Sequence, residues 1–219
     1  MATLAASSLK PRKQPLQARS QATVNAIFEA TIQVLLAEGL QKLTTVKVAE
    51  RAGVSVGTLY QYYPHKQALL YAVLQRHLAR VGEAVAQAAR SVHGAPLAVM
   101  VSTVVKVFVK AKTINLEEGR ALYAVAGELD TRELVLASQR RGRAALAEML
   151  ATAADVEFED VATAAFMLNT AMIGPMQPVI EGNAPAKLVR NLPGQLESLA
   201  LGYLEREARA RESLTGNVG

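Results

Sequence analysis

The sequence predicts an all-α protein with a small N-terminal unit of three helices, a long connector helix and a larger C-terminal helical domain. Apolar residues recur at three- and four-residue spacing along most of the 219 residues, which is the period of an amphipathic helix. Glycine and proline clusters separate these segments at helix-length intervals. One β-branched stretch, "VSTVVKVFVK", resembles a strand, but its length and the lack of a partner strand nearby favour a helix.

The composition limits the class of protein. With 51% hydrophobic residues, the chain can bury a substantial core, as one domain or as two small ones. The chain contains no cysteine, which excludes disulfides, thiolate zinc sites, iron–sulfur clusters and a cysteine nucleophile. No apolar run approaches the roughly 20 residues that span a bilayer, and the N-terminus lacks the apolar segment of a secretory signal. We therefore expect a cytoplasmic protein with no membrane partner.

Basic residues are concentrated in the first third of the chain. Residues 1–80 carry ten Lys or Arg and three acids, a net charge of +7, whereas residues 81–219 carry fourteen Lys or Arg and sixteen acids. A positive surface attracts polymers that carry phosphate groups, so the asymmetry suggests an anionic partner. A solvated surface without such a partner is the alternative.

The N-terminal unit begins with an aperiodic segment. Residues 1–15 contain small residues, two prolines and a basic group, and we expect them to form a flexible arm. A helix begins near Leu16 and ends at Gly39, because glycine often follows a helix C-terminus. The basic residues of the arm are Lys10, Arg12 and Lys13.

Two short helices across a glycine turn are expected next. Thr44 or Thr45 can cap the first, Gly53 supplies the turn, and Ser55 caps the second. The second helix ends before Pro64, because the residue before a proline is displaced from the helical region. This arrangement predicts a helix-turn-helix. The inner positions expected for the first helix are Val46, Ala49 and Ala52.

The rest of the chain reads as helices with short links. A connector helix continues the apolar spacing from Pro64 toward Ala89, and "HGAP" then interrupts the chain. We expect three parts: the arm at 1–15, a helix-turn-helix domain at 16–65, and the connector plus a further helical domain at 66–219. The later helical windows are 97–108, 116–129, 131–153, 158–173 and 192–210.

The helix-turn-helix segment resembles a known family. The stretch "TTVKVAERAGVSVGTLYQYYPHKQALL", preceded by "FEATIQVLLAEG", is similar to the tetracycline-repressor (TetR) family of bacterial transcriptional regulators over about residues 16–75. The resemblance implies a DNA-binding regulator, usually a repressor that a small-molecule effector releases from double-stranded operator DNA. It also implies a homodimer whose C-terminal helical bundle binds the ligand and dimerises.

The first turn of the second motif helix is the expected reading surface. Ser55 as the cap leaves Val56, Gly57 and Thr58 where a recognition helix meets base edges, and an exposed Val56 favours a thymine methyl group. Glycine inside a helix costs about 1 kcal/mol relative to alanine, which is easier to understand where the backbone approaches DNA closely. Thr45, at the N-terminus of the first motif helix, can add a hydroxyl and a backbone N–H for a phosphate, or serve as a simple cap.

Three tyrosines follow. The resemblance assigns Tyr60 to a phosphate or base contact and Tyr63 to an inward aromatic position, and Tyr62 lies one helical turn beyond Thr58 as a second outward candidate. The alternative for all three is a rim of rings packed against the first helix.

Basic and histidine side chains complete the expected contacts. The resemblance implies that Lys66 reaches a phosphate, with a solvated lysine as the alternative. His65 departs from the family pattern, which has a capping residue there, and a pH-sensitive phosphate contact is a hypothesis for this residue. The arm residues are expected to bind phosphates or the minor groove, or else to remain a solvated tail.

The C-terminal domain is expected to hold an effector and to dimerise, both by resemblance. Its apolar faces suggest an effector that is mainly apolar, although an ordinary helical core needs the same residues. The candidate pocket residues are Met100, Val104, Phe108, Tyr123, Met149, Phe166, Met167 and Asn169. The candidate dimer residues form an apolar stripe near the C-terminus, namely Leu196, Leu199, Tyr203 and Leu204.

Two other classes of function compete with the regulator. One is a helical small-molecule-binding or scaffold protein without operator function. The other is an enzyme, but the sequence has only three histidines, none spaced with carboxylates as metal ligands, and no phosphate loop or nucleophile elbow. We therefore expect no catalytic residue, metal or cofactor.

Overall fold

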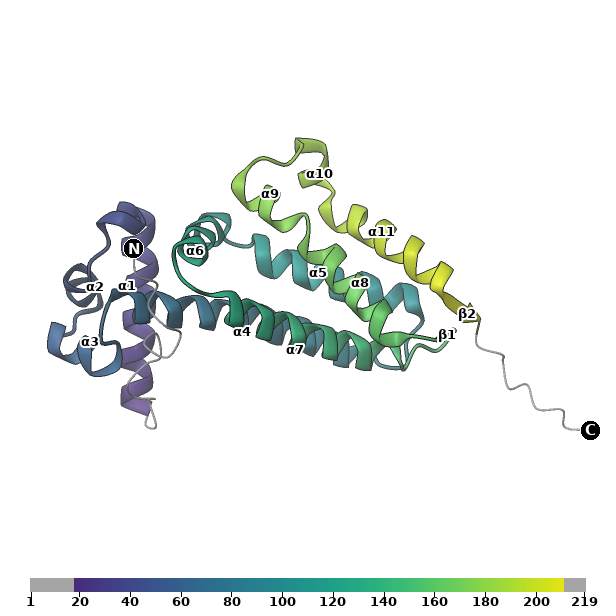
Figure 1. The fold of residues 1–219 in the computed structure, drawn as a ribbon, viewed down its shortest axis with the longest axis horizontal. Coiled ribbons are helices and arrows are strands. Elements are labelled where there is room, and N and C mark those ends of the chain that lie inside the picture. The colour runs from purple at the N-terminus through teal and green to yellow at the C-terminus, as the bar shows by residue number, and fades with distance from the viewer. Residues whose placement is uncertain (1–17, 211–219) are drawn as a thin grey trace, which may run out of the picture. The chain divides into compact units, whose positions relative to one another are not determined.

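The computed structural model describes residues 18–210, which form an all-α fold apart from one short strand pair (Figure 1). The chain divides into two compact units. Unit 1 comprises the chain up to Arg80 and the later segment 115–136. Unit 2 comprises residues 81–114 and the chain from Ala137 onward. The predicted fold class is confirmed.

Unit 1 contains the three N-terminal helices, the first part of the long α4, all of α6 and the start of α7. The first helix is interrupted at Gly39, whose φ of 80° and ψ of 168° are non-helical, at the position expected from the sequence. The bounds are α1 Ala18–Lys42, α2 Thr45–Ala52, α3 Val56–Tyr62, α4 Lys66–Ser91, α6 Leu116–Glu128 and α7 Arg132–Leu150.

Helix α6 is built into the core of unit 1. Leu122 and Val125 are buried in one cluster with Ile27 of α1, Leu59 of α3 and Leu69 of α4. Periodicity predicted α6 as a helix, but an apolar face does not reveal which core covers it. A segment from the second half of the sequence therefore supports the N-terminal helices.

Polar contacts hold both ends of α6 within unit 1. At its C-terminal end, Gln41 of α1 donates from Nε2 to Oε1 of Glu128 at 2.8 Å. At its N-terminal end, Arg80 of α4 donates to Oε1 of Glu118 at 2.9 Å. The helix is thus fixed by its buried side chains and by polar contacts near each end.

Unit 2 is organised around α5, which packs against α8 and α11. The stretch that resembled a strand is helical, and its buried residues include Met100, Val104 and Phe108. Other bounds in this unit are α5 Leu97–Thr113, α8 Val161–Ile173, α9 Met176–Glu181, α10 Ala186–Arg190 and α11 Leu192–Glu207.

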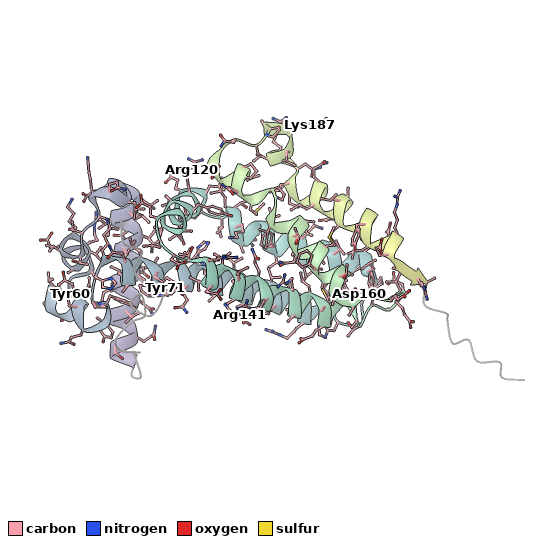
Figure 2. All side chains as sticks on the ribbon, in the orientation of Figure 1. Tyr60, Tyr71, Arg120, Arg141, Asp160 and Lys187 are labelled. Atoms are coloured by element: carbon pink, nitrogen blue, oxygen red, sulfur yellow. The ribbon has the colours of Figure 1, made fainter. Side chains whose placement is uncertain are left out.

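A short antiparallel strand pair, which the sequence did not predict, closes unit 2. Strand β1 (Val156–Phe158) pairs with β2 (Ala208–Ala210), with Glu157 opposite Arg209. Helix α8 consequently begins later than expected. Asp160, labelled in Figure 2, precedes α8 and accepts from the backbone N of Thr163 at 3.0 Å. Hydrogen bonds from the Thr163 side chain and backbone hold the pKa of Asp160 below its ordinary value.

Within residues 18–210, every helix falls short of the length and apolarity that crossing a bilayer requires. The same part of the chain holds no group of three or more His, Asp or Glu side chains placed to bind a metal ion.

The role of α6 can be tested by Leu122→Ala. Removing this buried side chain should destabilise unit 1 by about 2–5 kcal/mol, because it leaves a cavity in the shared core. The measurement is hydrogen exchange of the amides in α1 to α3 of the full-length protein, which should exchange faster. The control is Leu116→Ala on the exposed start of the same helix, and unchanged exchange in α2 and α3 of Leu122→Ala would contradict the assignment of α6 to this core.

Candidate nucleic-acid interface

Helices α2 and α3 are set by two caps and one glycine turn. Thr44 accepts from the backbone N of Lys47 at 3.3 Å and caps α2. Gly53 has a φ of 67°, and its N–H donates to the carbonyls that end α2, a conformation that glycine adopts without steric cost. Ser55 caps α3 by accepting from the backbone N of Thr58 at 3.0 Å. The predicted helix-turn-helix is present with these caps.

His65 has a structural role at the start of α4. Its Nδ1 accepts from the backbone N of Ala68 at 3.1 Å, so the ring satisfies one of the unpaired donors of the first helical turn. The preceding Tyr63 is extended, with φ of −127°, as expected for a residue before proline. His65 thus supplies the cap that the family pattern places at this position.

The three clustered tyrosines separate into one exposed and two buried residues. Tyr60 is 41% exposed, whereas Tyr62 and Tyr63 are 7% and 4% exposed. Tyr62 was expected to point outward and is instead buried, because it lies three positions after the buried Leu59 on the inward face of α3. The ring of Tyr63 lies 5.7 Å from that of Phe28, and burial raises the pKa of its hydroxyl.

The exposed face of α3 contains Gly57, Tyr60 and Gln61. Figure 2 labels Tyr60, whose hydroxyl lies 3.0 Å from Oγ1 of Thr45, so α2 and α3 are joined by a hydrogen bond at this face. Gln61 was not predicted as a site residue, although its spacing of four from Gly57 places it on the same face.

The first turn of α3 agrees only in part with the expectation that Val56, Gly57 and Thr58 all face the DNA. Val56 is half-buried against the core of unit 1, which limits the thymine-methyl contact considered for it. Oγ1 of Thr58 lies 2.8 Å from Oγ of Ser55. A Cβ added to Gly57 would meet only the Ser55 hydroxyl, at 3.7 Å. The fold of this chain therefore does not require glycine at position 57.

Lys66 is engaged within the protein. Its Nζ donates to the carbonyl oxygen of Leu40 at 2.6 Å, at the end of α1. Burial lowers the pKa of Lys66, and the nearby carboxylate of Glu128 opposes that shift. A phosphate contact by Lys66, as the resemblance implied, would have to share this ammonium group with Leu40.

The charge of unit 1 is more balanced than residues 1–80 suggested. The segment 115–136 adds five acids and two arginines, which lowers the net charge from +7 to +4. Lys47 in α2 is paired with Glu38 of α1. The arm residues Lys10, Arg12 and Lys13 lie outside the described residues.

The expected pocket residues fall into three groups. Met100, Val104, Phe108 and Met149 are buried, and so is Asn169, whose Oδ1 would lie 3.2 Å from a Cβ added to Gly142 on α7. Tyr123 belongs to α6 and therefore to unit 1. Phe166 and Met167 were expected in the pocket but are 47% and 41% exposed on α8.

The expected dimer residues are also divided. Leu196 and Leu204 are buried in the core of unit 2, Tyr203 is half-buried, and Leu199 is 58% exposed. Two of the four residues of the apolar stripe, Leu196 and Leu204, therefore pack into the core of unit 2 on one side of α11. Leu199 lies on the other side of α11, a helix that packs against both α5 and α8.

Two family descriptions match this chain. Residues 27–73 match "Bacterial regulatory proteins, tetR family", and residues 96–204 match "Tetracyclin repressor-like, C-terminal domain". The chain belongs to the TetR family of bacterial regulatory proteins. The family and the relatives below are transcriptional regulators rather than enzymes.

Sequence relatives match over the N-terminal part. The HTH-type transcriptional repressor KstR of Mycolicibacterium smegmatis is 42% identical over 55 residues, 25% of this chain and 27% of KstR. The uncharacterized HTH-type transcriptional regulator YvkB of Bacillus subtilis is 34% identical over 65 residues, 30% of this chain and 34% of YvkB. The matches thus span about a third or less of these relatives.

Solved structures match over most of the fold. A TetR-family transcriptional regulator from Mesorhizobium loti has a TM-score of 0.70 at 17% identity, covering 87% of this chain and 98% of that one. SmeT, the repressor of the Stenotrophomonas maltophilia multidrug efflux pump SmeDEF, has a TM-score of 0.65 at 17% identity, covering 89% and 93%. At these identities the similarity concerns the fold.

The different burial of Tyr62 and Tyr60 predicts unequal losses of stability. Tyr62→Ala should lower the free energy of unfolding by about 3–5 kcal/mol, because it empties a buried aromatic position. Tyr60→Phe should cost less than about 1.5 kcal/mol, because only one partly exposed hydrogen bond is lost. Hydrogen exchange of the α2 and α3 amides measures both, and equal effects would show that the two rings are not buried differently.

Proposed function

We propose that this protein is a ligand-responsive transcriptional repressor that binds double-stranded operator DNA as a homodimer. The observation that carries the proposal is the capped helix α3, whose outer face presents Gly57, Tyr60 and Gln61 without a covering segment among the described residues. A helix-turn-helix inserts such a helix into the major groove. The similarity to the repressor KstR over the same region supports this role.

Each residue on this face has a chemical task. The missing side chain of Gly57 allows the backbone of α3 to approach the DNA closely. The amide of Gln61 can bond the N6 and N7 atoms of adenine, and the hydroxyl of Tyr60 can donate to a phosphate oxygen. The bond between Tyr60 and Thr45 restrains the tyrosine before DNA binds, so less side-chain entropy is lost on binding.

An exposed apolar surface supports homodimerisation. Phe166 and Met167 on α8 and Leu199 on α11 are all more than a third exposed, and the guanidinium of Arg143 lies 5.1 Å from the centre of the Phe166 ring. Aromatic residues, methionine and arginine are enriched at protein interfaces. A two-fold pairing through this surface would give two recognition helices for half-sites about 34–36 Å apart.

The effector would act through chain segments shared by the units. The buried side chains Met100, Val104, Phe108 and Met149 suit a mainly apolar effector. The chain passes between the units within α4, between α5 and α6, and within α7. An effector that binds one arrangement of unit 2 more tightly would increase the population of that arrangement. Through these segments it would change the fraction of the protein that is competent to bind DNA.

DNA contacts are tested by Gly57→Leu, Tyr60→Ala and Gln61→Ala. Each should weaken binding to the DNA upstream of the protein's own gene, because each removes close approach or a contact worth about 1–3 kcal/mol, roughly five- to 150-fold. Affinity is measured by fluorescence anisotropy at several salt concentrations. Binding should weaken as salt rises.

The matched control is Gln75→Ala, an exposed residue of α4 in unit 1. Its affinity should equal that of the unchanged protein. If all three α3 variants also bind normally, α3 is not the reading helix. If the unchanged protein shows no salt-dependent binding, the scaffold alternative is favoured.

The dimer surface is tested by Met167→Glu combined with Leu199→Glu. The two carboxylates should dissociate the dimer, because an interface core does not tolerate unpaired charges. Sedimentation velocity gives the mass. Val189→Glu on the exposed surface of α10 is the control and should remain dimeric, and a double variant that stays a dimer would place the interface elsewhere.

A further inference from the structure

A groove of about 430 Å³ lies on unit 1, apart from the α3 face. It is formed by α1, α4 and the first turn of α6, and all its lining residues belong to unit 1. Its volume falls within the roughly 300–1,000 Å³ typical of small-molecule sites. No residue that we assign to DNA binding or to the dimer surface lines it.

The floor of the groove is apolar. Phe28, Ile32 and Leu36 of α1 share one side, and Val73 of α4 contributes the other. Leu36 is 41% exposed, whereas the other large apolar residues of α1 are buried or half-buried. Such a floor favours a ligand with a hydrocarbon or aromatic part, because covering it removes apolar surface from water.

Arg76 provides a fixed positive charge at this floor. Its guanidinium lies 5.2 Å from the centre of the Phe28 ring and donates from Nη1 to Oδ1 of Asn25 at 2.8 Å. Among the described residues it forms no salt bridge. A guanidinium has five N–H donors, so most remain available in a defined orientation that matches a carboxylate.

Arg76 is the candidate anion site of the groove because the other charged groups there are either paired with one another or negatively charged. Glu118 is engaged by Arg80 at 2.9 Å and lies 3.2 Å from Nδ1 of His77. Glu29 and Arg76 are both exposed, but Arg76 is restrained by its contacts with Phe28 and Asn25. Glu118, the carboxylate of the groove that is not exposed, therefore already has partners. The guanidinium of Arg76, stacked on Phe28, donates only to the neutral side chain of Asn25 among the described residues.

We propose that this groove binds a small organic acid whose carboxylate pairs with Arg76 and whose apolar part covers Phe28, Ile32, Leu36 and Val73. The site lies in the same unit as the recognition helix and is distinct from the effector site proposed for unit 2. A ligand bound here contacts α1, α4 and α6 together. It therefore stabilises the arrangement of these three helices without any signal from unit 2.

The test uses octanoate as the probe and the full-length protein without DNA. Octanoate should shift the backbone amide resonances of residues 28–36 and 73–80, as followed by NMR titration. Arg76→Gln should weaken binding about tenfold or more, because the variant loses the charge-assisted hydrogen bonds to the carboxylate. Arg90→Gln, an exposed arginine near the other end of α4, is the matched control and should bind octanoate normally.

Two further measurements separate the alternatives. Leu36→Trp fills the groove but keeps Arg76, and it should abolish the octanoate shifts. Octylamine, with the same chain and the opposite charge, should bind more weakly than octanoate. Equal binding by Arg76→Gln, tighter binding of octylamine through Glu29, or shifts confined to unit 2 would each overturn the proposal. None of these outcomes depends on whether the protein binds an operator.

Discussion

The burial of Leu122 and Val125 in the core of unit 1 is the constraint on which much of this structure depends. These side chains bring α6, a helix from the second half of the sequence, against α1. Three features follow from this packing. Glu118 reaches Arg80, Gln41 reaches Glu128, and the groove beside Arg76 acquires its third wall. The stability of the N-terminal helices is therefore tied to α6, which lies wholly within unit 1 but comes from a later part of the chain.

Electrostatic interactions within unit 1 are directed largely at holding helices together. Lys47 pairs with Glu38, Lys66 donates to Leu40, and Arg80 pairs with Glu118. Exposed ion pairs contribute about 0–1 kcal/mol each, so these contacts orient helix ends more than they stabilise the fold. The basic excess in the sequence thus overstates the charge that this unit offers to a partner.

Much of the fold and part of the site were predictable from the sequence. The helix-turn-helix was recoverable because its determinants are local: Gly53 sets the turn and Ser55 caps α3 through bonds spanning a few residues. Which face of each short helix points toward the core was not predictable. Val46 was expected inside and is exposed, and Tyr62 was expected outside and is buried. In helices of seven or eight residues, too few apolar positions exist to fix which face is inward.

Long-range packing was less predictable still. Phe166 and Met167 have the composition of core residues, and only tertiary structure shows that they lie on the surface of α8. The same holds for α6, whose sequence pattern is compatible with either core. The β1–β2 pair could not be foreseen because its two three-residue strands lie about fifty residues apart and each is too short to show alternation.

That strand pair has a consequence for assembly. It joins the C-terminal end of α11 to the segment just before α8, and Arg209 pairs with Glu159 beside it. The strand pair therefore holds the start of α8, which carries Phe166, close to the end of α11, which carries Leu199. If a second copy binds this surface, as proposed above, the restraint lowers the conformational entropy that is lost on association.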